Sequence, residues 1–253
     1  MKTYTPTRLS FALLLFLTFA AAVSAQQEQA KKDQKAAQPV AAAITATSTP
    51  LELARATFLA QGGEKFRTLK NMVLIGTVNM FQPGSTQSLT GQFGLIYAGD
   101  RMRMNIQTPL FQLEGIFDGE RSYTSMPRVQ LPPMNKLGLV ALAHFDQSGF
   151  SVTALPDKKK ERAFRITDTE GNTTDFYIDA TTARLIRYEV PYKGFTFSVE
   201  HTKVQEFEGI LVPINATWKI DLQGGAAYAE FKTKEVKLNQ TLPDDVFTIP
   251  SGS

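Results

Sequence analysis

The segment Ile210-Leu-Val-Pro-Ile-Asn-Ala-Thr-Trp-Lys-Ile-Asp-Leu222 alternates between apolar and polar residues along most of its length. Successive side chains of a β-strand point to opposite faces of a sheet, so this segment predicts a strand with one apolar face. The apolar face consists of Ile210, Val212, Ile214, Ala216, Trp218, Ile220 and Leu222. The opposite face is mostly polar, and one buried face with one solvated face is typical of an antiparallel sheet.

The same two-residue period continues outward from this strand and covers most of the chain after Asn71. The predicted strands are 72–81, 89–98, 101–107, 110–117, 121–125, 151–155, 162–167, 174–178, 184–190, 195–207, 210–222 and 226–238. Turn residues separate them, and Asp118-Gly119 is a strong hairpin signal. We therefore predict a mainly β fold, a single open (unclosed) antiparallel β-barrel of about eleven strands with helices packed on its concave face.

A helix is predicted before the first strand. Ser48 or Thr49 can cap it, Pro50 suits its first position, and Gly62-Gly63 ends it. Leu51, Ala54 and Phe58 fall at helical spacing and predict the apolar stripe that packs on the sheet.

The strand pattern is interrupted between Met126 and Gly149, where three prolines exclude a central strand. Residues 134–145 have helical character, interrupted by Gly138. We predict that the insertion 127–145 forms a mobile lid over the mouth of a cavity, with a fixed plug as the alternative. The apolar lid residues are Leu137, Leu139, Val140 and Leu142.

The chain begins with the features of a secretory signal peptide. Residues 1–25 combine a basic start, an apolar run from Leu9 to Phe19, and small residues at Val23-Ser24-Ala25. Residues 26–47 are rich in Ala, Gln and Lys without an aromatic residue, which predicts a disordered tether. We therefore expect a folded domain at 48–253 that is exported to the periplasm and is soluble after cleavage.

Composition excludes several classes of function. Lys2 and Arg8 are the only charged residues of the predicted signal peptide, so its removal lowers the net charge from +3 to +1. No basic surface for nucleic acid is expected at this charge. The chain has no cysteine and two histidines, His144 and His201, and we interpret His201 as a structural residue with satisfied hydrogen bonds. No catalytic or phosphate-binding motif is present. We expect no metal site, no cofactor and no enzymatic activity.

Phenylalanine and methionine are abundant in the predicted domain, and flexible, polarizable side chains suit an irregular apolar guest. The alternative is that these residues only fill a core. The predicted ligand-binding residues are Met72, Leu74, Val78, Met80, Phe93, Leu95, Met102, Met104, Phe111, Leu113, Phe197, Ile214 and Trp218.

Two segments resemble the LolA/LolB superfamily of periplasmic lipoprotein carriers. One is Leu51-Glu-Leu-Ala-Arg-Ala with the following Gly62-Gly63-Glu-Lys-Phe-Arg-Thr-Leu-Lys-Asn71, and the other is Leu242-Pro-Asp-Asp-Val-Phe-Thr-Ile-Pro250. The resemblance implies an unclosed barrel whose helices plug the concave face, with an apolar cavity for the acyl chains of a lipoprotein or lipid. It also implies a possible membrane-protein partner in the envelope, and we expect a monomer. The alternative is an envelope sensor or interaction module of the same fold that docks a protein partner.

Overall fold

The computed structural model describes residues 44–126, 132, 138–158, 160–222 and 225–250. They belong to one compact unit of the chain, Pro39–Ser253. The predicted signal peptide, most of the predicted tether, and 127–131 and 133–137 of the insertion lie outside the described residues. Residues 44–47 already contact the domain, because Ile44 packs against its core and the carbonyl oxygen of Thr45 accepts a hydrogen bond from Arg162.

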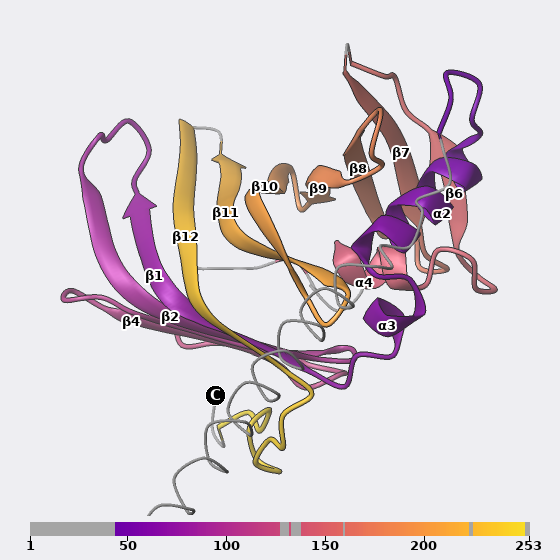
Figure 1. Cartoon of the computed structure of the whole chain (residues 1–253). Helices are drawn as coiled ribbons and strands as arrows, with labels where there is room; N and C mark the ends of the chain where they lie inside the picture. The colour runs from indigo at the N-terminus through magenta and orange to yellow at the C-terminus, as the bar shows by residue number, and fades with distance from the viewer. Residues whose placement is uncertain (1–43, 127–131, 133–137, 159, 223–224, 251–253) are drawn as a thin grey trace, which may run out of the picture. The chain divides into compact units, whose positions relative to one another are not determined.

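Within the described residues, twelve strands form one antiparallel sheet (Figure 1). They are β1 (Met72–Phe81), β2 (Ser88–Ala98), β3 (Arg101–Gln107), β4 (Gln112–Phe117), β5 (Ser122–Thr124), β6 (Ser151–Ala154), β7 (Glu161–Thr167), β8 (Thr173–Asp179), β9 (Leu185–Tyr192), β10 (Phe195–Phe207), β11 (Ile210–Leu222) and β12 (Gly225–Leu238). The spatial order is β5-β4-β3-β2-β1-β12-β11-β10-β9-β8-β7-β6. The sheet is therefore open between β5 and β6, which confirms the predicted open antiparallel barrel.

The first and last strands join the two halves of this sheet. The β1–β12 pairing runs from Met72 opposite Leu238 to Phe81 opposite Tyr228, with an irregularity between Ile75 and Gly76. At Gly76 the two backbones approach so closely that a Cβ atom would lie 2.1 Å from the carbonyl oxygen of Lys232. Glycine is therefore required at this position of the strand.

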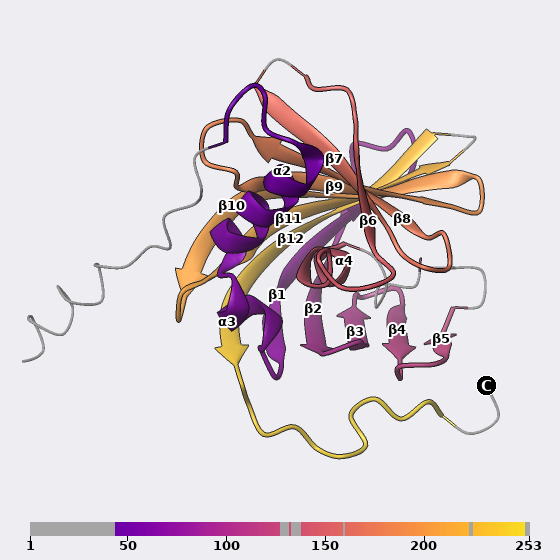
Figure 2. The ribbon, with the colours of Figure 1, turned by 90° about the vertical axis from the view of Figure 1, so that its right-hand side faces the viewer.

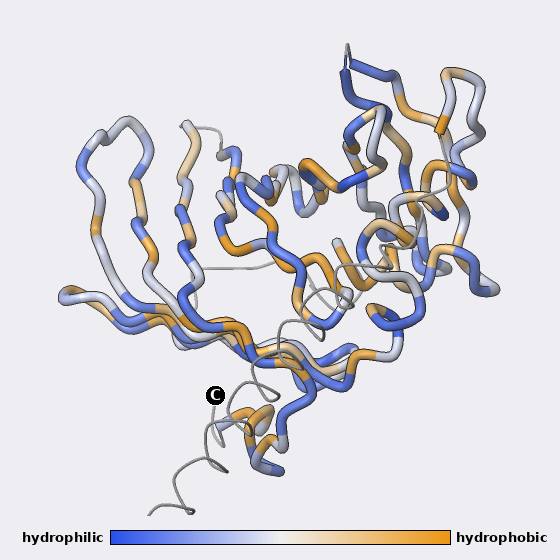
Figure 3. Tube along the Cα trace, in the orientation of Figure 1, coloured by the Kyte–Doolittle hydropathy of each residue, from blue (hydrophilic) through white to orange (hydrophobic). Residues whose placement is uncertain are grey.

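Hydrophobic and hydrophilic residues alternate along the strands (Figure 3). The apolar side chains of the inner face form the core, and aromatic rings fill much of it. Phe164 and Phe176 stack with ring centroids 5.1 Å apart, and Phe93 meets Phe231 edge-on at 5.0 Å. The outer face carries ion pairs such as Arg165 with Asp175.

The described helices are α2 (Pro50–Gln61), α3 (Glu64–Arg67) and α4 (Leu139–Ala143). Helices α2 and α4 lie inside the curve of the sheet, where α2 contacts β6, β7, β11 and α4 (Figures 1 and 2). This placement agrees with the prediction that helices cover the concave face. No helix among the described residues is both long and apolar enough to cross a bilayer.

Helix α2 begins with a capping box at Thr49. The backbone nitrogen of Thr49 donates to Glu52 Oε2 at 2.7 Å, and Glu52 N donates to Thr49 Oγ1 at 3.3 Å. The predicted apolar stripe is wrong at Leu51, which is 46% exposed. At 3.6 residues per turn, Leu51 lies about 200° around the helix from Leu53, which is buried against the sheet. Ala54 and Phe58 are buried as predicted.

Helix α4 is shorter than the predicted helix over 134–145, of which 134–137 lie outside the described residues. Gly138 does not interrupt this helix but precedes it as the N-cap residue. Its φ of +63° is a left-handed conformation that side-chain-bearing residues disfavour, so the helix begins after it.

Candidate binding cavity

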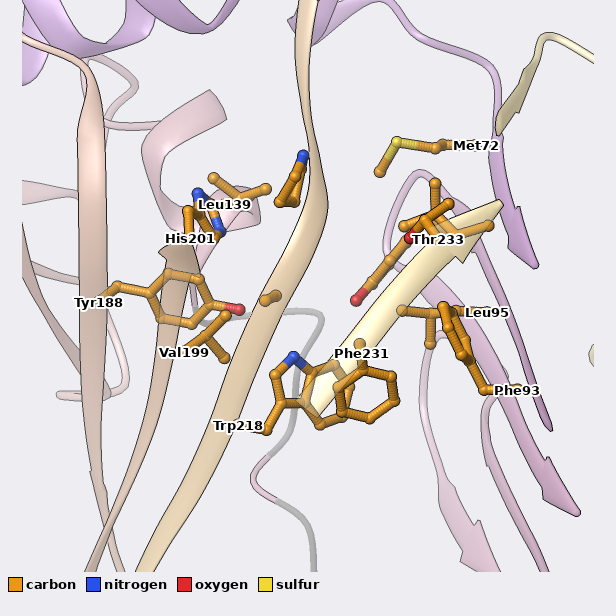
Figure 4. Close-up of a pocket in the computed structure, with 14 residues that line it drawn as sticks. Met72, Phe93, Leu95, Leu139, Tyr188, Val199, His201, Trp218, Phe231 and Thr233 are labelled. Carbon is orange, nitrogen blue, oxygen red and sulfur yellow. The ribbon is translucent and has the colours of Figure 1, made fainter. Parts of the chain in front are cut away.

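Two adjoining pockets open on the concave face. The first, here called the small pocket, has a volume of about 50 Å³ and is formed by β1, β2, β9–β12 and α4 (Figure 4). Its apolar wall includes Met72, Leu74, Phe93, Leu95, Val199 and Phe231. Trp218 contributes an indole ring whose centroid lies 4.7 Å from the Phe231 ring.

The second, here called the large pocket, has a volume of about 450 Å³. It is formed by the segment from α3 to the start of β1, the β2–β3 turn, and α4. Its lining includes two charged residues, Arg67 and Asp100. Four residues line both pockets: Met72, Tyr97, Leu139 and Tyr188. The side chain of Leu139 on α4 therefore lies at the boundary between the two.

The structure brings only part of the predicted ligand-binding set together. Five of these residues line the small pocket: Met72, Leu74, Phe93, Leu95 and Trp218. Five others are buried in the core and line neither pocket: Val78, Met102, Met104, Leu113 and Phe197. Met80 and Phe111 are partly buried against that core. The period of two identifies the concave face, but it does not reveal which part of that face remains open.

Ile214 also lies outside both pockets, whereas its neighbour Pro213 lines the small pocket. In the β10–β11 pairing, Lys203 is opposite Asn215 and Val204 is opposite Pro213, so Ile214 has no partner. It is the extra residue of a β-bulge, which breaks the strict alternation on which its assignment rested.

Only some of the predicted lid residues line the pockets. Leu139 lines both pockets and Val140 lines the large pocket. Leu142 is fully buried in the core and lines neither pocket, and Leu137 lies outside the described residues.

Polar groups that sequence patterning missed also face the small pocket: Tyr97, Tyr188, His201 and Thr233. Burial raises the pKa of Tyr97, and burial together with the neighbouring Tyr97 raises the pKa of Tyr188. Burial lowers the pKa of His201 to about 4. All three side chains are therefore uncharged at neutral pH. None of them belongs to a motif, and only the fold brings them together.

His201 lies edge-on to the ring of Tyr188, with centroids 6.2 Å apart and planes at 86°. Its Nδ1 atom is buried and has no hydrogen-bond partner among the described residues. The interpretation of His201 as a satisfied structural residue is therefore wrong. No described donor or acceptor forms a hydrogen bond with Nδ1, although Tyr97, Tyr188 and Thr233 line the same pocket.

Helix α4 is fastened at both ends. At its start, Gly138 N donates to Thr174 Oγ1 at 3.1 Å. At its end, Arg67 Nε donates to the carbonyl oxygen of Ala143 at 2.8 Å, and Arg67 Nη2 donates to Asp146 Oδ1 at 2.7 Å. The same guanidinium lies 4.3 Å from the centroid of the Phe58 ring on α2. Movement of α4 requires these contacts to break.

The described residues contain no cluster of His, Cys, Asp or Glu that could hold a metal ion. His144 Nδ1 is buried without a partner, as is His201 Nδ1, so no carboxylate in the described part of the chain bonds to either imidazole through this nitrogen. An oriented histidine base of the kind that activates a serine nucleophile is therefore not assembled there.

Neither a family model nor a curated protein matches this sequence. Solved structures do match. A LolA superfamily protein from Nitrosomonas europaea matches with a TM-score of 0.53 and 13% sequence identity, covering 80% of this chain and 99% of that one. This chain has a LolA-like fold. A DUF1329 family protein from Desulfovibrio piger matches with a TM-score of 0.50 and 10% identity, covering 79% of this chain and 98% of its own. At sequence identities of 10% and 13%, these similarities show a shared fold and nothing further.

Proposed function

We propose that this protein is an exported, soluble carrier that binds an amphiphilic ligand with acyl chains, a lipid or a lipoprotein, in the periplasm. The observation that carries the proposal is the pair of adjoining pockets on the concave face, with Leu139 at their boundary. The predicted signal peptide at 1–25 supports the location.

The size and lining of the large pocket suit a small amphiphile. Protein sites for small molecules have volumes of about 300–1,000 Å³ and combine apolar walls with a few polar groups. The large pocket has a volume of about 450 Å³, with Phe66, Leu69 and Leu139 as apolar lining and Arg67 as a cationic group. An acyl chain can bury its methylene groups there while its headgroup stays at the polar part of the lining.

A ligand that occupies both pockets must pass the residues that line both, which include Leu139 on α4. Since α4 is fastened through Gly138 and Arg67, we expect the ligand to exchange those contacts for its own. The mobile lid thus remains a prediction, in which opening breaks the contacts at both ends of α4.

The alternative is docking of a protein partner through a sheet edge or the lid, and strand addition finds little support at the open edges. Among the described strands, the edge strands are β5 with three residues and β6 with four. Short edge strands offer few unpaired backbone groups to a partner strand.

Titration with a fluorescent fatty acid tests the proposal. The protein is recovered from the periplasm of an exporting host, stripped of bound lipid and titrated. We expect saturable binding at one site, and lipid extracted from the unstripped protein. Absence of both probe uptake and co-purifying lipid would overturn the proposal.

Two variants that replace an alanine by phenylalanine locate the binding site. Ala216 lines the small pocket, and Ala216→Phe fills it. Ala154 is exposed on β6, so Ala154→Phe adds the same bulk away from both pockets. We expect the first variant to weaken probe binding by about tenfold and the second to leave it unchanged. Circular dichroism checks that both remain folded.

A further inference from the structure

The polar groups of the small pocket are not explained by an acyl chain, whose methylene groups form no hydrogen bonds. We propose that the small pocket binds an uncharged hydroxyl group on the buried part of the ligand, so that the protein selects hydroxylated chains over plain saturated chains. This inference rests on the proposed function and specifies its ligand class.

The polar side chains surround the pocket from several strands. Figure 4 shows Tyr188 and His201 on one side of it, Thr233 on the other, and Trp218 with Phe231 across one end. Tyr97 on β2 completes this set and interacts electrostatically with Tyr188. Each of these groups is a neutral donor, an acceptor or both, and a hydroxyl can bond to any of them.

The buried imidazole is the strongest observation. A buried nitrogen without a partner lowers stability, whereas an apolar residue of similar shape at that position would carry no such penalty. His201 Nδ1 is in this state among the described residues. A ligand hydroxyl near the ring would supply the hydrogen bond that the protein lacks.

The distribution of charge argues for an uncharged group. Among the described residues, no Asp, Glu, Lys or Arg lines the small pocket, whereas Arg67 and Asp100 line the large one. A buried ion without a counter-charge is strongly disfavoured. A carboxylate headgroup therefore stays outside the small pocket, which accepts a neutral group further along the chain.

Trp218 provides the reporter for a test. It is the single tryptophan of the chain and it lines the small pocket, so its fluorescence responds to a ligand there. Lipid-stripped protein is titrated with octadecanoic acid and with analogues that carry one hydroxyl at successive positions along the chain. We expect at least one position to bind about tenfold more tightly than octadecanoic acid, the gain typical of one good buried hydrogen bond.

Three variants test which side chains cause the preference for a hydroxylated chain. His201→Phe and Tyr188→Phe each remove a polar group of the small pocket, and either one should reduce the preference to about threefold or less. Tyr177→Phe is the matched control, because the Tyr177 hydroxyl bonds to Glu189 on the outer face, away from both pockets. Tyr188→Phe keeps the test decisive if His201→Phe does not fold.

The outcomes separate the two proposals. If octadecanoic acid binds and no hydroxylated analogue binds more tightly, the hydroxyl preference is overturned while the carrier proposal stands. A preference that survives in both His201→Phe and Tyr188→Phe also overturns it. If no fatty acid binds, both proposals fall together.

Discussion

Arg67 Nε donates a 2.8 Å hydrogen bond to the carbonyl oxygen of Ala143, the last residue of α4. The same side chain also binds Glu64 at 2.7 Å and Asp146 at 2.7 Å, so α3 is fixed to the segment that follows α4. Because α4 carries Leu139, we expect the contacts of this guanidinium to restrain any opening of the boundary between the pockets.

Arg67→Ala should loosen α4. Loss of a hydrogen bond from a charged donor is worth about 1.5–3 kcal/mol, so amide exchange in 139–143 should accelerate by about tenfold or more. Hydrogen exchange measured by mass spectrometry checks this, with Arg55→Ala on the exposed side of α2 as the control. Exchange in α4 that stays slow in Arg67→Ala, and in wild type with and without ligand, would identify α4 as a fixed plug.

Gly76→Ala should disrupt the pairing that joins the two halves of the sheet. The new Cβ would lie 2.1 Å from Lys232 O, so β1 or β12 must shift, and we expect a loss of about 2–3 kcal/mol in unfolding free energy. A Cβ atom added at Gly94 on β2 would have no neighbouring heavy atom within 4 Å. Gly94→Ala should therefore change the unfolding free energy by about 1 kcal/mol or less. Urea denaturation compares the two, and equal stabilities would refute the close-approach argument.

His201 should make stability depend on pH. Its pKa is about 4 in the folded chain and about 6.5 when unfolded, so between these values the unfolded chain binds more protons. The contribution of the neutral imidazole is complete above pH 6.5 and is lost as pH falls toward 4, by at most about 3 kcal/mol. The pH slope of the unfolding free energy should therefore be flatter in His201→Phe over this window, since the carboxylates are common to both proteins. Parallel slopes would show that His201 is not buried neutral.

The sequence predicts the local elements of this fold well because alternation is a local signal. The predicted strands at 195–207 and 210–222 have the bounds of β10 and β11. The β1–β12 pairing cannot be predicted from alternation. Met72 and Leu238 are far apart in the sequence, and they pair only because all twelve described strands form one sheet. The bulge at Ile214 and the polar cluster around His201 are equally non-local, which is why the predicted site omitted Tyr97, Tyr188, His201 and Thr233.

Two leucines of α4 separate the effect of opening the cavity from the effect of weakening the core. Leu139 is partly buried and lines both pockets, so Leu139→Ala should join them into one longer cavity. Leu142 is fully buried and lines neither, so Leu142→Ala removes the same atoms from the core, at a cost of about 2–5 kcal/mol.

We expect Leu139→Ala to bind long fatty acids more tightly and faster than wild type, because the chain no longer has to pass this side chain. Short fatty acids that fit within the large pocket should bind with unchanged affinity. Leu142→Ala should lower stability without any gain for long chains. Displacement of a fluorescent fatty acid across a series of chain lengths measures affinity in both variants, and stopped-flow fluorescence of Trp218 measures the rate for chains that reach the small pocket. An equal gain in the two would mean that general loosening of the domain, and not the position of Leu139 between the pockets, limits access to the cavity.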